Sequence, residues 1–151
     1  MRTAGARAEV MLEPVAALAL WADTGRWAGF VEGFAHVESV DAAWPQEGSR
    51  VIWKSTPDGR GRVTEKVLEK GEARLVTQVF EEALTGTQTF AAHAGPPGGS
   101  VVEVLLDYEL ARRGPLRGIS DVLFIRRALR DALRRTTFRF AVEAEEEAGL
   151  R

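Results

Sequence analysis

The sequence predicts an α+β domain in which an antiparallel sheet is followed by one long C-terminal helix. Residues 34–110 form about six apolar-alternating segments at hairpin spacing, with no long helical segment between them. Residues 119–148 contain neither proline nor glycine and carry apolar side chains at helical spacing. Because 151 residues make one ordinary domain, we expect residues 1–151 to fold as a single unit.

The composition is that of a globular domain, with 45% hydrophobic and 28% charged residues. Cysteine is absent, which excludes disulfides, zinc fingers, iron–sulfur clusters and a thiol nucleophile. The net charge of −2 gives no general reason to expect nucleic acid binding. No apolar run approaches the roughly 20 residues of a membrane span, and no secretory signal is evident. We therefore expect a cytoplasmic protein without a membrane span.

The N-terminal part predicts a strand followed by two short helices. Ala8–Leu12 is a short apolar segment that indicates the strand. Pro14–Ala22 begins with a proline, which suits a first helical turn, and continues with strong helix formers. Asp23–Gly25 ends this helix, and Thr24 is placed to cap a second one over Arg26–Glu32.

Six further strands are predicted, separated by turn residues such as those of Thr56–Gly59 and of the Gly- and Pro-rich loop Ala94–Ser100. The predicted strands are Phe34–Ala43, Arg50–Ser55, Arg60–Glu69, Arg74–Leu84, Thr87–His93 and Val101–Leu110. The last strand is the clearest, because acidic residues alternate with an apolar face made of Val102, Val104, Leu106, Tyr108 and Leu110.

The C-terminal helix is predicted from Ile119 to about Ala148, after a Pro- and Gly-interrupted connection over residues 112–118. Ser120 is placed to cap it. A helix of this length spans about 42 Å, enough to lie along a whole sheet. Its apolar stripe consists of Ile119, Val122, Leu129, Leu133 and Phe140.

This layout resembles the helix-grip fold of the START-like, or SRPBCC, superfamily, and within it the polyketide cyclase/dehydrase and lipid-transport group. The resemblance covers about residues 8–144 and includes no catalytic signature. The segments that carry it are EPVAALALWADTGRWAGFVEGF, EGSRVIWKSTPDGRGRVTEKVLE, VVEVLLDYEL followed by RGPLRG, and ALRDALRRTTFRF. It implies a curved antiparallel sheet of about seven strands wrapped around the long helix, with a cavity for an apolar small molecule between them.

Arg126 is the most unusual candidate for ligand binding, because it lies close to the apolar stripe of the long helix. A buried arginine keeps its charge, so it needs a carboxylate or a ligand oxygen as partner. Glu65 is the candidate carboxylate partner. The alternative is that the side chain of Arg126 reaches solvent at the rim of the cavity. Tyr108 would offer a hydroxyl to the ligand. The remaining candidates for the cavity wall are Trp27, Phe30, Trp53, Phe80, Phe90, Leu129 and Leu133.

Other classes of site have little support in the sequence. His36 and His93 lie on separate predicted strands without a metal-ligand spacing, so we expect no metal and no cofactor. Gly59–Arg62 reads as a turn, and no P-loop, dinucleotide motif or nucleophile elbow is present. Nine arginines between residues 112 and 139 make a local basic surface that could meet nucleic acid or anionic lipid. Because RNA-binding motifs are missing, we expect no nucleic acid partner.

Three functions are compatible with these observations. The leading hypothesis is a small-molecule binding protein with an internal apolar cavity for a lipid, a polyketide or an aromatic metabolite. The alternative is a metal-free enzyme of the polyketide cyclase/dehydratase type, which orients its substrate and polarises a carbonyl in that cavity. A partner-binding or regulatory module is the third. No residue is assigned as catalytic, and the sequence leaves a homodimer open.

Overall fold

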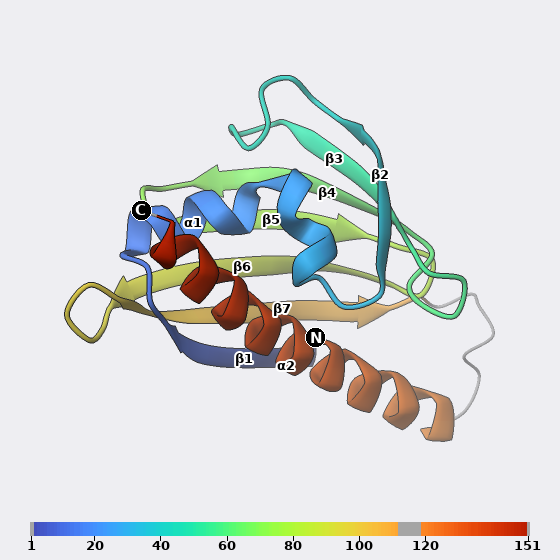
Figure 1. Ribbon diagram of the computed structural model, residues 1–151. Coiled ribbons are helices and arrows are strands. Elements are labelled where there is room, and N and C mark those ends of the chain that lie inside the picture. Colours follow the sequence, from blue (N-terminus) through green and yellow to red (C-terminus); the bar gives the residue numbers. More distant parts are fainter. Residues whose placement is uncertain (1, 112–118, 151) are drawn as a thin grey trace.

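The computed structural model describes residues 2–111 and 119–150, with the backbone alone for residues 119–122. Its helices α1 (Pro14–Ala22) and α2 (Ile119–Gly149) and the 3-10 helix η1 (Thr24–Gly29) lie on one face of a seven-stranded sheet (Figure 1). Its strands are β1 (Arg2–Val10), β2 (Phe34–Val40), β3 (Arg50–Ser55), β4 (Arg62–Lys70), β5 (Arg74–Phe80), β6 (Leu84–Ala94) and β7 (Ser100–Leu110).

All neighbouring strands are antiparallel, and their order in the sheet is β1-β7-β6-β5-β4-β3-β2. Consecutive strands from β2 to β7 are joined as hairpins, while β1 closes the sheet beside β7. The predicted fold class is therefore confirmed: a seven-stranded antiparallel sheet, two short helices after the first strand and a long C-terminal helix.

The first strand lies earlier in the chain than its apolar pattern predicted. β1 covers Arg2–Val10 rather than Ala8–Leu12, and its whole length pairs with β7, from Arg2 opposite Tyr108 to Val10 opposite Ser100. The alanine- and arginine-rich sequence has little strand propensity of its own. Pairing with β7 and packing against α2 stabilise it instead, so tertiary context overrides propensity here.

The second short helix also differs from its prediction. It is a 3-10 helix over Thr24–Gly29, and Asp23 rather than Thr24 caps it, because the Asp23 carboxylate accepts a hydrogen bond of 3.0 Å from the Gly25 amide. The indole of Trp27 donates to the carbonyl oxygen of Trp21 at 2.8 Å. This bond ties η1 to the end of α1 and directs Trp27 into the core.

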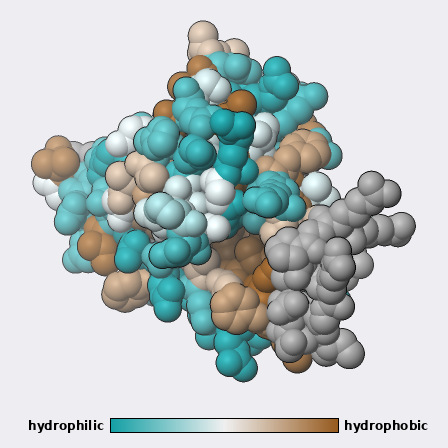
Figure 2. All heavy atoms as spheres, turned by 90° about the vertical axis from the view of Figure 1, so that its right-hand side faces the viewer, coloured by the Kyte–Doolittle hydropathy of each residue, from teal (hydrophilic) through white to brown (hydrophobic). Residues whose placement is uncertain are grey.

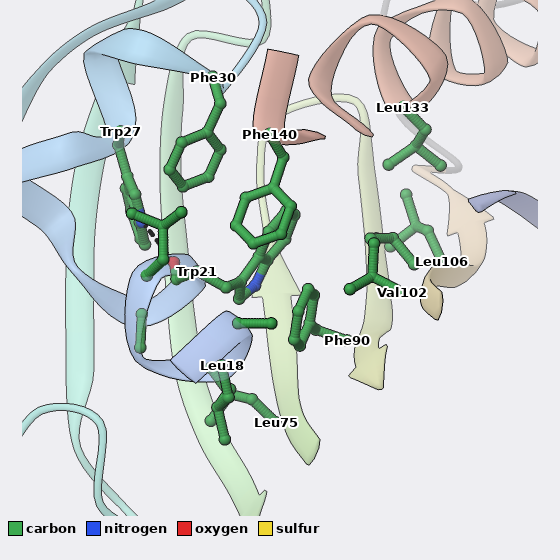
Figure 3. Close-up of a cluster of buried hydrophobic side chains, with 14 of the residues drawn as sticks. Leu18, Trp21, Trp27, Phe30, Leu75, Phe90, Val102, Leu106, Leu133 and Phe140 are labelled. Carbon is green, nitrogen blue, oxygen red and sulfur yellow. Dashed lines mark hydrogen bonds between the residues drawn. The ribbon is translucent and has the colours of Figure 1, made fainter. Parts of the chain in front are cut away.

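The core lies between the inner face of the sheet and the three helices. At its centre an aromatic cluster joins all of these layers (Figure 3). Trp21 of α1 stacks on Phe90 of β6 with ring centroids 4.8 Å apart, and Phe140 of α2 meets Phe30 edge-on at 5.1 Å. Such contacts add to the stabilisation that burial of the rings already provides.

Helix α2 runs along the β1 edge of the sheet and buries one stripe, as predicted for Leu129, Leu133 and Phe140. The predicted contributions of residues 119–122 to this stripe and to the helix cap, and the predicted connection over 112–118, lie outside the described residues and side chains. At the other end, Arg26 of η1 binds Glu143 at 2.8 Å and Glu147 at 3.0 Å. In the described part of the chain, no helix combines the length and hydropathy that crossing a bilayer requires.

Candidate functional site

A cavity of about 50 Å3 lies between the sheet and α2. One water needs about 10–15 Å3 of such space, so the cavity holds a few waters or a few ligand atoms. Figure 2 shows a hollow with hydrophobic residues at its floor on the side of the molecule where the β3–β4 and β5–β6 turns lie. The apolar wall consists of Trp21, Trp27, Phe30, Val31, Trp53, Leu106, Leu129, Ala132 and Leu133, and the polar groups belong to Glu32, Arg60, Glu65, Gln88 and Thr136.

Glu65 is a buried carboxylate on the inner face of the sheet. It lies on β4 and accepts hydrogen bonds from three neighbouring strands: from Trp53 Nε1 on β3 at 2.8 Å, from Thr77 Oγ1 on β5 at 3.1 Å and from Gln88 Nε2 on β6 at 3.4 Å. These neutral donors replace the water that the carboxylate loses on burial. Glu65 is thus fixed in position and presents an acceptor to the cavity.

Arg60 lies in the turn between β3 and β4, and its side chain reaches back over the sheet. Its Nε binds Glu81 Oε2 at 2.5 Å, and its guanidinium carbon lies 5.4 Å from the centroid of the Trp53 ring. Its Nη2 atom is buried and has no hydrogen-bond partner among the residues that the structure describes. The guanidinium is therefore held on two sides and keeps a free donor beside the cavity.

Glu81 holds this arginine in place from the turn between β5 and β6. Its side chain is only 3% exposed. Burial raises the pKa of Glu81, and the positive charge of Arg60 opposes that rise in part. A buried carboxylate with a single cationic partner is costly to leave unpaired, so the two side chains depend on each other.

Six of the ten predicted cavity residues line the cavity: Trp27, Phe30, Trp53, Glu65, Leu129 and Leu133. Phe90 is buried but lies outside the wall, because it stacks on Trp21. Tyr108 is also buried outside the wall, and its hydroxyl has no hydrogen-bond partner within residues 2–111 and 123–150.

The placements predicted for Arg126 and Phe80 are wrong. Arg126 is exposed, because the first turns of α2 extend past the end of β1 (Figure 1), and it does not pair with Glu65. Phe80 is 41% exposed. It lies opposite Thr64 and Thr85, on the outer face of the sheet, whereas its neighbour Val79 points inward.

Four polar residues of the cavity wall, Arg60, Glu32, Gln88 and Thr136, were not predicted from the sequence. The turn predicted at Gly59–Arg62 is confirmed for Gly59–Gly61, whereas Arg62 begins β4. A signal was nevertheless present, since a tight β3–β4 hairpin brings a turn residue close to Trp53 at the end of β3. The length of an arginine side chain then lets its guanidinium reach the ring.

Comparison with known proteins supports the fold. No family model and no curated protein matches the sequence. Among solved structures, the Zhui aromatase/cyclase from Streptomyces sp. R1128 is 13% identical with a TM-score of 0.78, covering 99% of this chain and 96% of that one. A START superfamily protein from Mycobacterium smegmatis is 13% identical with a TM-score of 0.73, covering 96% and 98%. TTHA0849 from Thermus thermophilus is 17% identical with a TM-score of 0.70, covering 99% and 97%.

At these identities the likeness is one of fold. The seven-stranded antiparallel sheet with its long C-terminal helix is the helix-grip fold that the START superfamily protein and the aromatase/cyclase also have.

Proposed function

We propose that this chain is a small-molecule binding protein whose cavity takes a mainly apolar ligand with one carbonyl or carboxylate oxygen. The observation that carries the proposal is the buried Nη2 of Arg60, which has no partner in the described part of the chain and borders an aromatic cavity. An arginine N–H forms strong hydrogen bonds to such oxygens, particularly where water is excluded. A fatty acid, a polyketide or an aromatic acid has this chemistry.

The site is organised in advance for one polar contact. Glu81 and the face of Trp53 fix the guanidinium of Arg60, so little side-chain freedom remains to be lost on binding. The rest of the wall is dominated by aromatic and aliphatic side chains, which favour an apolar ligand body. Similar folds in an aromatase/cyclase and in a START superfamily protein support a small molecule as the occupant.

The size of the cavity limits what binds without rearrangement. Sites for drug-sized ligands measure roughly 300–1,000 Å3, far above the 50 Å3 found here. A ligand of a few carbon atoms fits directly. A larger one must displace Leu129 and Leu133, which line the cavity from α2, so its binding requires α2 to move away from the sheet.

A second candidate function is catalysis of the cyclase/dehydratase type. It is favoured by the presence of a carboxylate, Glu65, and an arginine N–H, Arg60, in the wall of one cavity. In such a reaction Glu65 would take a proton from a carbon next to a carbonyl, and Arg60 would stabilise the enolate oxygen. The enolate carbon would then attack a second carbonyl of the same substrate molecule, and the alkoxide formed would take back the proton from Glu65.

Thermal denaturation with a ligand panel tests the binding proposal. The panel pairs fatty and planar aromatic acids with hydrocarbons of the same shape, for example 2-naphthoic acid with naphthalene. Binding raises the melting temperature with the logarithm of excess ligand. We expect Arg60→Met/Glu81→Met to weaken binding of the acids at least tenfold and to affect the hydrocarbons less. The double substitution removes both charges together and so leaves no buried charge unpaired.

Arg62→Met/Glu38→Met is the matched control, because it removes another arginine–glutamate pair, of 2.9 Å, that does not line the cavity. It should leave the affinities unchanged. No melting shift with any compound, or equal affinities in the two double variants, would contradict the proposal. The enzyme alternative is tested separately by incubating a linear poly-β-ketone with the protein. The enzyme alternative predicts that the wild-type chain converts the poly-β-ketone into a product lighter by one water, or into an isomer of the same mass. The Glu65→Gln variant should not form this product.

A further inference from the structure

The outer face of α2, on the side opposite the cavity, exposes two large aromatic side chains. Phe124 is 73% exposed and Phe138 is 71% exposed. An α-helix turns by about 100° per residue, so residues 14 positions apart point within about 40° of each other and lie about 21 Å apart along the axis. The two rings therefore project from one side of the helix. Leu129 and Leu133 point to the other side, into the core.

This face is also strongly basic. Arg127, Arg130 and Arg134 are exposed on or beside this face, and none of them forms an ion pair with any residue that the structure describes. Between residues 123 and 139 the sequence contains a single acidic residue, Asp131. The charge is local, because the whole chain carries a net charge of −2.

The basic surface continues from the helix onto the edge of the sheet. Arg7 of β1 is exposed and lines a shallow groove together with Arg134 and Phe138. Two other arginines of α2 are engaged elsewhere, since Arg135 and Arg139 bind Glu32 at 3.4 Å and 2.8 Å. We call the first group, namely Arg7, Phe124, Arg127, Arg130, Arg134 and Phe138, the basic aromatic face.

We propose that the basic aromatic face docks on the surface of an anionic lipid bilayer, with α2 lying parallel to the membrane plane. Exposed arginines attract the phosphates of anionic lipids, and the two phenylalanine rings can enter the layer between headgroups and acyl chains. A flat surface is the partner that reaches both rings at once, because they lie about 21 Å apart along one convex side of the helix. The contact is peripheral and involves no membrane span.

This proposal is independent of the ligand-binding proposal, since the two use opposite sides of α2. If both hold, a membrane contact would act on the same helix that supplies Leu129 and Leu133 to the cavity. The test below measures membrane binding alone.

Vesicle flotation with the full chain tests the proposal. We expect binding to phosphatidylcholine vesicles that contain roughly one-third phosphatidylglycerol, no binding to pure phosphatidylcholine, and loss of binding between about 0.05 M and about 0.5 M salt. Arg127→Gln/Arg130→Gln/Arg134→Gln should weaken binding roughly a hundredfold, about fivefold for each arginine. Phe124→Ser/Phe138→Ser should weaken it at least tenfold.

Matched controls come from the outer face of the sheet. Arg50→Gln/Lys54→Gln/Lys66→Gln removes the same charge, and Phe80→Ser removes another exposed ring. Both should keep wild-type binding, and circular dichroism melts show whether each variant is folded. The proposal is wrong if anionic vesicles do not bind at low salt, or if the control variants lose as much binding as the face variants. It is also wrong if the face variants abolish only binding to duplex DNA or RNA, or only a concentration-dependent dimer seen by light scattering.

Discussion

The indole of Trp53 contacts Glu65 with its edge, through a hydrogen bond of 2.8 Å from Nε1, while the guanidinium of Arg60 lies over its face at 5.4 Å. One aromatic side chain thus positions two of the three charged groups that line the cavity, the third being Glu32. This arrangement places a carboxylate and a guanidinium in the same cavity wall without a direct salt bridge between them. It leaves the arginine donor free and the carboxylate bound by neutral groups.

Trp53→Phe keeps the ring and removes the N–H group. We expect the free energy of unfolding to fall by about 1–3 kcal/mol, because Glu65 loses one of its three donors inside the protein. Urea denaturation measures this change. Trp44→Phe is the comparison, since the Trp44 indole also donates, to the Ala22 carbonyl, but is only half-buried. An equal loss in both variants would show that burial of Glu65 is not the cause.

Leu133→Ala removes a side chain between α2 and the sheet. Leu133 is buried and borders the cavity, so we expect a loss of about 2–5 kcal/mol from lost burial and an enlarged cavity. Leu123→Ala, on the same helix but 57% exposed, should change stability by less than about 0.5 kcal/mol. Chemical denaturation of both variants checks this pair. A loss of less than about 0.5 kcal/mol for Leu133→Ala would show that this face of α2 does not pack on the core.

Glu81 should make stability depend on pH with a defined sign. Because burial raises its pKa, the folded chain keeps the Glu81 proton to higher pH than the unfolded chain does. The free energy of unfolding therefore falls as the pH rises from the ordinary pKa of glutamate, about 4.3, through the raised value in the folded state. In Glu81→Gln this contribution disappears. Urea denaturation at several pH values should show the native chain losing stability relative to Glu81→Gln as the pH rises, and a constant difference would contradict this assignment.

Gly86 lies on β6 directly opposite Tyr108 of β7. A Cβ atom at Gly86 would lie 2.4 Å from the carbonyl oxygen of Asp107 and 3.1 Å from Tyr108 Cα. We therefore expect Gly86→Ala to cost about 1–3 kcal/mol through strain between β6 and β7. Gly71→Ala is the control, since the nearest atom to its Cβ would be 3.7 Å away. Melting curves that rank the two variants the other way would contradict this account.

Local periodicity explains which parts of this fold were predictable. In β7 the alternation of apolar and acidic residues marks the inner face directly, and Val102, Val104, Leu106 and Tyr108 are all buried. In β5 the inner and outer faces both contain apolar residues, so the orientation of Phe80 depends on pairing with β4 and β6, which no local pattern reveals.

The candidate site was less predictable because it depends on where elements end. Helical periodicity gives the direction of Arg126 but not the fact that the helix extends past the sheet at that point. Arg60 reaches the cavity from a turn, and turn residues carry no periodic signal of burial. Glu65, by contrast, lies within an alternating strand and shares its buried face with Val63 and Val67.

The pairing of β1 with β7 has a kinetic consequence. Strands β2 to β7 can form one hairpin after another, each with a short loop between partners. β1 is made first, yet its partner residues lie 90 to 106 positions further along the chain. Contacts of such long sequence separation slow folding, because closing a long loop costs entropy before any hydrogen bond forms. During synthesis β1 therefore cannot pair until β7 has been made, at least 90 residues later.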